Sequence, residues 1–121
     1  MATDEITRAT AEQYLDEMLA AEGDDDYAAF TRRFEQKDLE DYGESRFRKD
    51  MYAIREDFGE YRDREYLGSL KGFVDADQPD RHPGGVRHVW RGIFEKNETV
   101  IVVGLHERDG TVHVNEIMYY N

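Results

Sequence analysis

The fold is decided by residues 86–120, VRHVWRGIFEKNETVIVVGLHERDGTVHVNEIMYY, in which three alternations of apolar and polar residues are separated by turn residues. Alternation with a period of two is typical of strands that bury one face. The strands are predicted at 86–95, 98–107 and 111–120. Lys96-Asn97 and Asp109-Gly110 are predicted as two-residue hairpin turns, and Asp-Gly is a strong type I′ signal. The three strands therefore form an antiparallel meander.

The segment before the meander adds one more strand. Residues 61–74 are predicted as this strand, and Gly68 and Gly72 indicate a bend or a bulge in it. Residues 75–85 contain both prolines and two adjacent glycines, so we predict a long exposed loop there. The sheet is expected to have four antiparallel strands.

The first half of the chain has the 3.6-residue period of amphipathic helices. The first predicted helix covers 3–22, with Thr3 as its N-cap and Gly23 ending it. The acidic run 24–26 is predicted to begin a short second helix; an acidic metal-binding cluster is the alternative. A third helix is predicted over 45–58, with a connecting turn at 39–43 before it. The apolar positions of these helices are Ala11, Tyr14, Leu15, Met18, Leu19, Tyr27, Phe30, Phe34, Phe47, Met51, Ile54 and Phe58.

This order of elements predicts an α+β fold, with three N-terminal helices packed on a curved antiparallel four-stranded meander. The 121 residues are the usual size of one domain, so we predict a single domain over 1–121. A chain of this length buries roughly two-thirds of its unfolded surface, which is enough for a core without disulfides. The sequence has no cysteine.

The charge of the chain narrows the range of partners. There are 28 acidic and 16 basic residues, which give a formal net charge of -12. Residues 1–60 hold 18 acids and 8 bases, a net of -10, whereas 61–121 hold 10 acids and 8 bases, a net of -2. We predict no nucleic-acid partner and no membrane association, because nucleic acids and anionic membranes are negatively charged and would repel the chain. The acidity fits a salt-loving source, although an Arg-rich coding bias explains the excess of Arg over Lys equally well.

The N-terminus favours a cytoplasmic location. Residues 1–5 are acidic and include no apolar run, unlike a secretory signal. No stretch approaches the roughly 18–20 apolar residues that span a bilayer. A secreted chain whose leader had been removed would look the same.

The predicted register assigns the strand residues to two sheet faces. The first face is apolar except for His88 and Glu116, and it is expected to pack on the helices. A carboxylate on an apolar face has a raised pKa unless it is paired or solvated, so His88 and Glu116 are the candidate catalytic residues. The alternative is that the sheet curves away there and leaves Glu116 wet or salt-bridged. The apolar members of this face are Trp90, Phe94, Ile101, Val103, Leu105, Val112, Val114 and Met118.

The second face is more apolar than a solvent-facing surface needs to be. An apolar patch with a polar rim is typical of an interface, so we predict a homodimer through this face. Coverage by the 75–85 loop is the alternative. The predicted interface residues are Arg87, Val89, Arg91, Ile93, Val100, Val102, Ile117 and Tyr119.

The sequence predicts no metal and no cofactor. His106 and His113 oppose each other in the predicted register and could supply two ligands. No third ligand follows beside them, and a pair of surface histidines is the alternative interpretation.

Two stretches resemble a known superfamily. Residues 47–68 contain an apolar-faced helix, then Phe58-Gly59-Glu60-Tyr61, then a strand with Tyr66-Leu67-Gly68. This junction and the final strands, 100–105 and 112–119, are similar to the cystatin-like α+β superfamily, which includes nuclear transport factor two, ketosteroid isomerase and scytalone dehydratase. The resemblance implies a cone-shaped cavity between helices and sheet, and dimers that pair their sheets. The residues it implies as cavity lining are Tyr14, Tyr27, Phe30, His88, Trp90 and Glu116.

Three functions follow as hypotheses. The first is a noncatalytic, dimeric domain that binds a small apolar or aromatic molecule. The second is an enzyme of the isomerase or dehydratase kind that uses Glu116 and His88 as acid and base. The third is a module that binds another protein through the exposed sheet face.

Overall fold

The computed structural model describes residues 7–72, 77 and 84–120. Its helices come first in the chain: α2 (Arg8–Asp24), α3 (Tyr27–Phe30), the 3-10 helix η1 (Gln36–Asp41) and α4 (Glu44–Phe58). The strands are β1 (Tyr61–Lys71), β2 (Val86–Phe94), β3 (Glu98–Arg108) and β4 (Thr111–Tyr120). They pair antiparallel in the order β1-β2-β3-β4. The predicted α+β fold, helices followed by a four-stranded meander, is confirmed.

Local capping sets the ends of α2. The helix begins after Thr7, whose hydroxyl accepts a 3.4 Å hydrogen bond from the backbone N–H of Thr10. The predicted cap, Thr3, lies outside the described residues. The predicted end at Gly23 is wrong, because α2 continues until Asp25 adopts a left-handed conformation with φ 58°.

The later helices form close to their predicted positions. Asp26 caps α3 by accepting a 3.1 Å hydrogen bond from the Ala29 N–H, which supports the capping interpretation of the acidic run. α4 is followed by Gly59, with φ 76°, as predicted. The predicted turn at 39–43 is partly occupied by η1.

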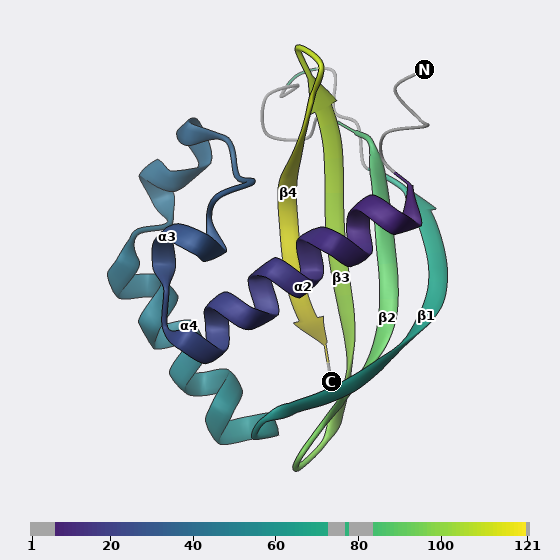
Figure 1. Ribbon diagram of the computed structural model, residues 1–121. Helices are drawn as coiled ribbons and strands as arrows, with labels where there is room; N and C mark the ends of the chain where they lie inside the picture. Colours follow the sequence, from purple (N-terminus) through teal and green to yellow (C-terminus); the bar gives the residue numbers. More distant parts are fainter. Residues whose placement is uncertain (1–6, 73–76, 78–83, 121) are drawn as a thin grey trace.

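The helices and the sheet share one core. In the view of Figure 1, α2 crosses one face of the sheet, and α3 and α4 lie beside the β4 edge. We call the sheet face toward α2 the inner face and the opposite one the outer face. Large side chains with less than 2% exposure come from both layers: Leu15, Met18, Phe30, Phe47, Trp90, Ile101, Val103, Leu105 and Val114.

Two sheet signals in the sequence are confirmed. Asp109 and Gly110 have φ of 54° and 80°, the two positive values that a type I′ turn requires. The pairing of β1 with β2 shifts between Tyr66 and Gly68, where the glycine indicated a bulge. Most of the predicted 75–85 loop lies outside the described residues.

The turn between β2 and β3 lies one residue earlier than predicted. Ile93, not Glu95, pairs with Glu98. The backbone N–H of Glu95 donates a 2.8 Å hydrogen bond to the carbonyl of Glu60, and the next N–H donates one of 2.8 Å to the Phe58 carbonyl. The junction of α4 and β1 therefore holds the turn in place. The register moves by two residues, so the face assignments in β2 and β3 are unaffected.

A β-bulge in β4 corrects the predicted faces. Leu105 pairs with Val114 as predicted, but Gly104 pairs with Glu116, so Asn115 is an extra residue. A Cβ on Gly104 would lie 2.5 Å from Asn115 Oδ1 and 3.0 Å from Glu116 Cβ, so a larger residue would force these side chains to shift. One extra residue reverses the alternation of side chains beyond it.

The bulge exchanges the two faces over the last part of β4. Glu116 and Met118 were predicted on the inner face and lie on the outer one. Ile117 and Tyr119 were predicted on the outer face, and both pack against the core, where the Tyr119 and Phe94 ring centroids are 6.1 Å apart. The predicted interface thus loses two of its residues.

Candidate functional site

A cleft opens between α4 and the free edge of β4. Its volume is about 1110 Å³, which exceeds the roughly 300–1,000 Å³ of most ligand pockets. Phe34 and residues of α3, η1 and α4 form one wall, residues 115–119 form the other, and Gly72, Gly84 and Arg87 complete the lining. The apolar and aromatic lining residues are Phe30, Phe34, Tyr42, Met51, Ala53, Ile54, Phe58, Ile117, Met118 and Tyr119.

Packed aromatic rings support the helical wall. Phe30 lies at the centre, with its ring centroid 4.9 Å from Phe47, 5.8 Å from Phe34 and 6.3 Å from Tyr42. Such pairs add about 0.5–1.5 kcal/mol each beyond the burial of their area. The hydroxyl of Tyr27 donates a 2.6 Å hydrogen bond to the Tyr42 carbonyl. The wall is therefore preformed rather than assembled by a ligand.

A buried carboxyl–phenol pair connects the lining residue Tyr119 to α2. The hydroxyl of Tyr119 donates a 2.5 Å hydrogen bond to Oε1 of Glu22, which is 8% exposed. Burial raises the pKa of Glu22 to about 7, although this hydrogen bond and the charge of Arg55 oppose the rise. Burial and the Glu22 carboxylate raise the pKa of Tyr119 well above its ordinary value. Near neutral pH, the Glu22 carboxyl therefore exists in both charged and neutral forms.

Charged residues surround the apolar lining, and acids exceed bases. Among the described residues, five carboxylates and three cations line the cleft. Ion pairs join Lys37 to Asp38 at 3.3 Å and Arg46 to Asp50 at 3.8 Å. The remaining lining charges, which make no ion pair within the described part of the chain, are Asp41, Asp57, Glu116 and Arg87.

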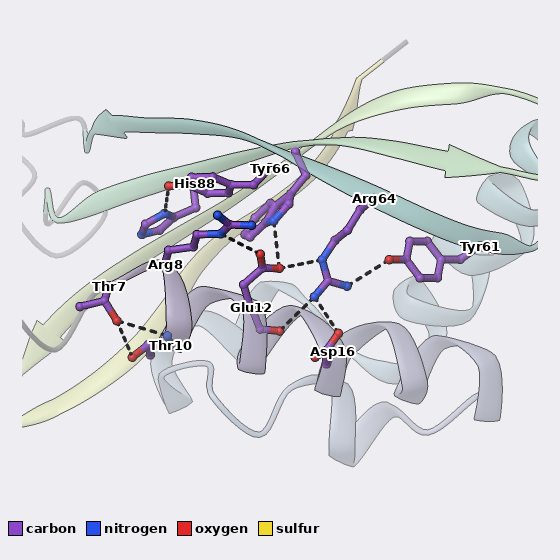
Figure 2. Close-up of polar contacts among 10 residues, drawn as sticks. Thr7, Arg8, Thr10, Glu12, Asp16, Tyr61, Arg64, Tyr66 and His88 are labelled. Atoms are coloured by element: carbon purple, nitrogen blue, oxygen red, sulfur yellow. Dashed lines mark hydrogen bonds and ion pairs between the residues drawn. The ribbon is translucent and has the colours of Figure 1, made fainter.

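A polar network fastens the other end of α2 to the sheet (Figure 2). Oε1 of Glu12 accepts hydrogen bonds from Trp90 Nε1 at 3.0 Å and from Arg64 Nε at 2.8 Å. Oε2 of Glu12 accepts one of 3.1 Å from Arg8, and Arg64 also pairs with Asp16 at 2.7 Å. Burial works against ionisation of Glu12, but these donors hold its pKa below the ordinary value.

The two candidate catalytic residues lie on opposite faces of the sheet. His88 is 3% exposed on the inner face, and its Nδ1 lies 2.9 Å from the Tyr66 hydroxyl (Figure 2). Glu116 lies on the outer face and lines the cleft. The structure does not bring these two side chains together, so they have no geometry for shared acid–base work.

Only Phe30 and Glu116 of the six predicted lining residues border the cleft. Trp90 is fully buried, and its indole N–H is occupied by the polar network. Tyr14 is 7% exposed, and its hydroxyl donates a 3.2 Å hydrogen bond to a carbonyl of β4. Tyr27 supports the wall from behind. These three aromatics are part of the core, because the helices pack on β2 and β3 without leaving space there.

The outer face keeps six of the eight predicted interface residues: Arg87, Val89, Arg91, Ile93, Val100 and Val102. Arg91 forms ion pairs with Glu65 at 3.6 Å and with Glu98 at 3.7 Å. Exposed apolar side chains on this face are Val100 at 37%, Met118 at 43%, Tyr120 at 46% and Leu70 at 54%.

A buried histidine secures the segment before η1 to the sheet. His106 is 3% exposed; its Nδ1 lies 2.8 Å from Nδ2 of Asn115, and its Nε2 bonds to Glu35. Glu35 also pairs with Arg108 at 3.0 Å. Burial lowers the pKa of His106 against the opposing effect of Glu35. His113 opposes His106 as predicted, and no group of three potential metal ligands occurs in the described residues.

Sequence reasoning missed the Glu22–Tyr119 pair, although half of it left a signal. Leu15, Met18 and Glu22 have the i, i+3, i+7 spacing of one helix face, so a carboxylate on the apolar stripe of α2 was visible. The inward position of Tyr119 depends on the bulge, for which Gly104 was the only indication.

Comparisons of the chain with protein-family models, curated proteins and solved structures found no match. Function must therefore be argued from the geometry of the cleft. None of the helices in the described part of the chain has both the length and the apolar character needed to cross a membrane.

Proposed function

We propose that this chain is a noncatalytic binding domain that holds a small apolar or aromatic molecule in the cleft between α4 and β4. The observation that carries this proposal is the preformed aromatic wall around a solvent-connected space of about 1110 Å³. Transfer of apolar ligand surface from water into such a space is favourable. An enzyme that uses Glu116 with His88 is less well supported, because these side chains face opposite sides of the sheet.

The same observations support membership of the cystatin-like superfamily as part of the proposal. Helices precede a four-stranded meander, as the resemblance implies, although the cleft lies at the β4 edge, beside α4, and not over the inner face of the sheet. The proposal includes the cone shape of that superfamily, which an experimental structure would test. A closed sheet, or a cleft filled by the chain itself, would contradict it.

Binding of the neutral dye Nile red tests the proposed function. We expect saturable fluorescence enhancement by the wild-type protein. Ala53→Trp places a large side chain into the cleft from α4, and it should weaken binding at least roughly tenfold, or about 1.4 kcal/mol. Ala20→Trp, at an exposed position of α2, is the matched control and should bind as wild type does. No saturable binding, or equal binding by both variants, would refute the proposal.

A second candidate function is homodimerisation through the outer face. It is favoured by the exposed apolar side chains of Val100, Met118 and Tyr120 on neighbouring strands. Light scattering at low micromolar concentration should give twice the 14.2 kDa chain mass, and Met118→Lys should give the monomer mass. A monomer at all concentrations would remove this candidate without affecting the cleft.

A further inference from the structure

We infer that the ligand of the cleft is an extended peptide segment, which adds to the sheet as a fifth strand beside β4. The inference rests on the proposed binding function, and it assigns the apolar lining to alternate side chains of a peptide in place of a free small molecule. Recognition of this kind draws affinity from main-chain hydrogen bonds and specificity from pockets for alternate side chains.

The backbone of β4 offers a free edge along the cleft. β4 is the last strand of the sheet. Within the described residues, its one backbone hydrogen bond to a segment other than β3 runs from the Val114 N–H to the Arg33 carbonyl at 2.8 Å. The residues 115–119 all line the cleft. Consecutive strand residues point to alternate faces, so a cleft that contacts all five must border the strand edge.

The chain itself begins the pairing that we propose for the peptide. Phe34 forms a parallel bridge with Val114, and the chain then turns away into η1. The cleft starts where this bridge stops, since Phe34 and Asn115 both line it. A bound segment would continue a ladder whose first step the structure already contains.

The shape of the cleft favours a single strand over a second copy of the chain. Met51, Ile54 and Phe58 of α4 form the wall that faces β4. A strand needs about 4.8 Å beside its neighbour, whereas a second copy would have to bring its own sheet and helices into this bounded space. A cleft enclosed on two sides therefore favours a single extended segment over a folded domain.

Charge and side-chain alternation specify the peptide further. Alternate side chains of a fifth strand would face the aromatic lining, which favours apolar residues at every second position. The others would face the charged rim, where Asp41, Asp57 and Glu116 have no ion pair in the described residues and Arg87 is the remaining cation. Excess negative charge attracts cations. The predicted ligand alternates apolar and basic residues.

The test uses the full chain and a capped peptide of about six residues, matched to the length of 115–120, in which valine and lysine alternate. We expect it to displace Nile red and to slow amide hydrogen exchange in 115–120. A peptide with the same side chains but N-methyl groups on alternate backbone nitrogens should bind at least roughly tenfold more weakly, because its ladder hydrogen bonds are lost. Glutamate in place of lysine should also weaken binding.

Protein variants separately test how much the carboxylates of the cleft contribute to binding of the lysine peptide. Asp57→Asn and Glu116→Gln should each weaken the lysine peptide about two- to fivefold, the size of an exposed ion pair. Asp63→Asn, at an exposed position of β1, is the control and should leave binding unchanged.

The outcomes separate the inference from the function on which it rests. If Nile red binds but the N-methylated peptide competes as well as its parent, or no peptide competes, the inference is overturned and the binding function stands. If Nile red does not bind, the proposed function itself fails. Protection of 115–120 that rises with protein concentration in the absence of peptide would identify a second copy as the occupant and overturn the inference.

Discussion

Glu12 and Glu22 lie on the same helix, yet α2 places them in opposite surroundings. Glu12 accepts hydrogen bonds from Trp90, Arg64 and Arg8, and its pKa is lowered. The carboxylate of Glu22 receives one hydrogen bond within the described residues, from Tyr119, and burial raises its pKa to about 7. One end of the helix is fastened by charge, whereas the other lies beside an open cleft.

The comparison shows that burial alone does not determine the state of a carboxylate. Desolvation disfavours the charged form at both sites, and cationic donors reverse the outcome only at Glu12. The network of Glu12 fixes α2 on β1 and β2, so it serves structure. The cleft beside Glu22 and Tyr119 keeps accessible apolar surface, which is where binding energy is available.

The largest expected difference between the two regions is in their cores. Trp90→Ala should lower the free energy of unfolding by about 3–5 kcal/mol, because it leaves a cavity in a fully buried site. Ile54→Ala, in the half-buried cleft wall, should cost about 1 kcal/mol, since less apolar surface returns to water. Urea unfolding at pH 7 measures both values. Equal losses would mean that Ile54 in the cleft wall is as fully buried as Trp90 in the polar network.

The next largest effect should come from removal of Arg64. Arg64→Met should lower the free energy of unfolding by about 2–3 kcal/mol, because Glu12 loses its main cationic partner. The pKa of Glu12 should rise. A carboxylate whose pKa is lowered by folding stabilises the fold at pH values above its ordinary pKa, and this stabilisation is lost as the pH falls. The free energy of unfolding of Arg64→Met should therefore fall less steeply with acid than that of wild type.

Arg8 provides the control for Arg64. Its side chain is 59% exposed, although it contacts the same carboxylate at 3.1 Å. Arg8→Met should cost below about 1 kcal/mol, as exposed ion pairs do. A loss as large as that of Arg64→Met would show that burial of the cation is not what matters.

Glu22→Gln should change the pH dependence of stability. The pKa of Glu22 is about 7 in the folded chain and 4.5 ordinarily, so the folded state binds the proton more tightly between these values. Stability from this group is therefore complete below pH 4.5 and is lost as the pH rises through 7. As the pH rises from 4.5 to 7, the free energy of unfolding of Glu22→Gln should increase relative to that of wild type by about 2–3 kcal/mol. If the free energies of unfolding of the variant and of wild type differ by the same amount at every pH from 4.5 to 8, the raised pKa of Glu22 is contradicted.

Two glycines are predicted to have modest effects of opposite sign. Gly104→Ala should cost about 1–2 kcal/mol, because its Cβ would meet Asn115 Oδ1 at 2.5 Å and disturb the bulge that turns Tyr119 inward. Gly23→Ala, with nothing within 4 Å of its Cβ, should stabilise α2 by about 0.5–1 kcal/mol. Thermal unfolding separates the two signs. A neutral Gly104→Ala would show that the bulge does not need glycine.

Much of the fold was predictable, but the site largely was not. The helix at 45–58 and the turn at Asp109-Gly110 were predicted because periodicity and turn conformation depend on neighbouring residues. The cavity was predicted over the inner face and not at the β4 edge, because the strand wall of the cleft depends on the insertion of Asn115 between the Leu105–Val114 and Gly104–Glu116 pairs. The catalytic hypothesis placed His88 and Glu116 on one face, and the same insertion separated them.

Local patterns in the sequence were enough to predict the main helices and strands, their order and the acidic character of the helical half. These properties follow from local spacing, from capping and from a count of charges. The position of the β2–β3 turn, the faces of β4 and the opposite pKa shifts of Glu12 and Glu22 became visible in the folded chain alone. Each of these depends on a contact between residues that are distant in the chain. Glu60 bonds to Glu95 at the β2–β3 turn, Gly104 leaves space beside Asn115 at the bulge, and Arg64 and Tyr119 bond to the two glutamates of α2.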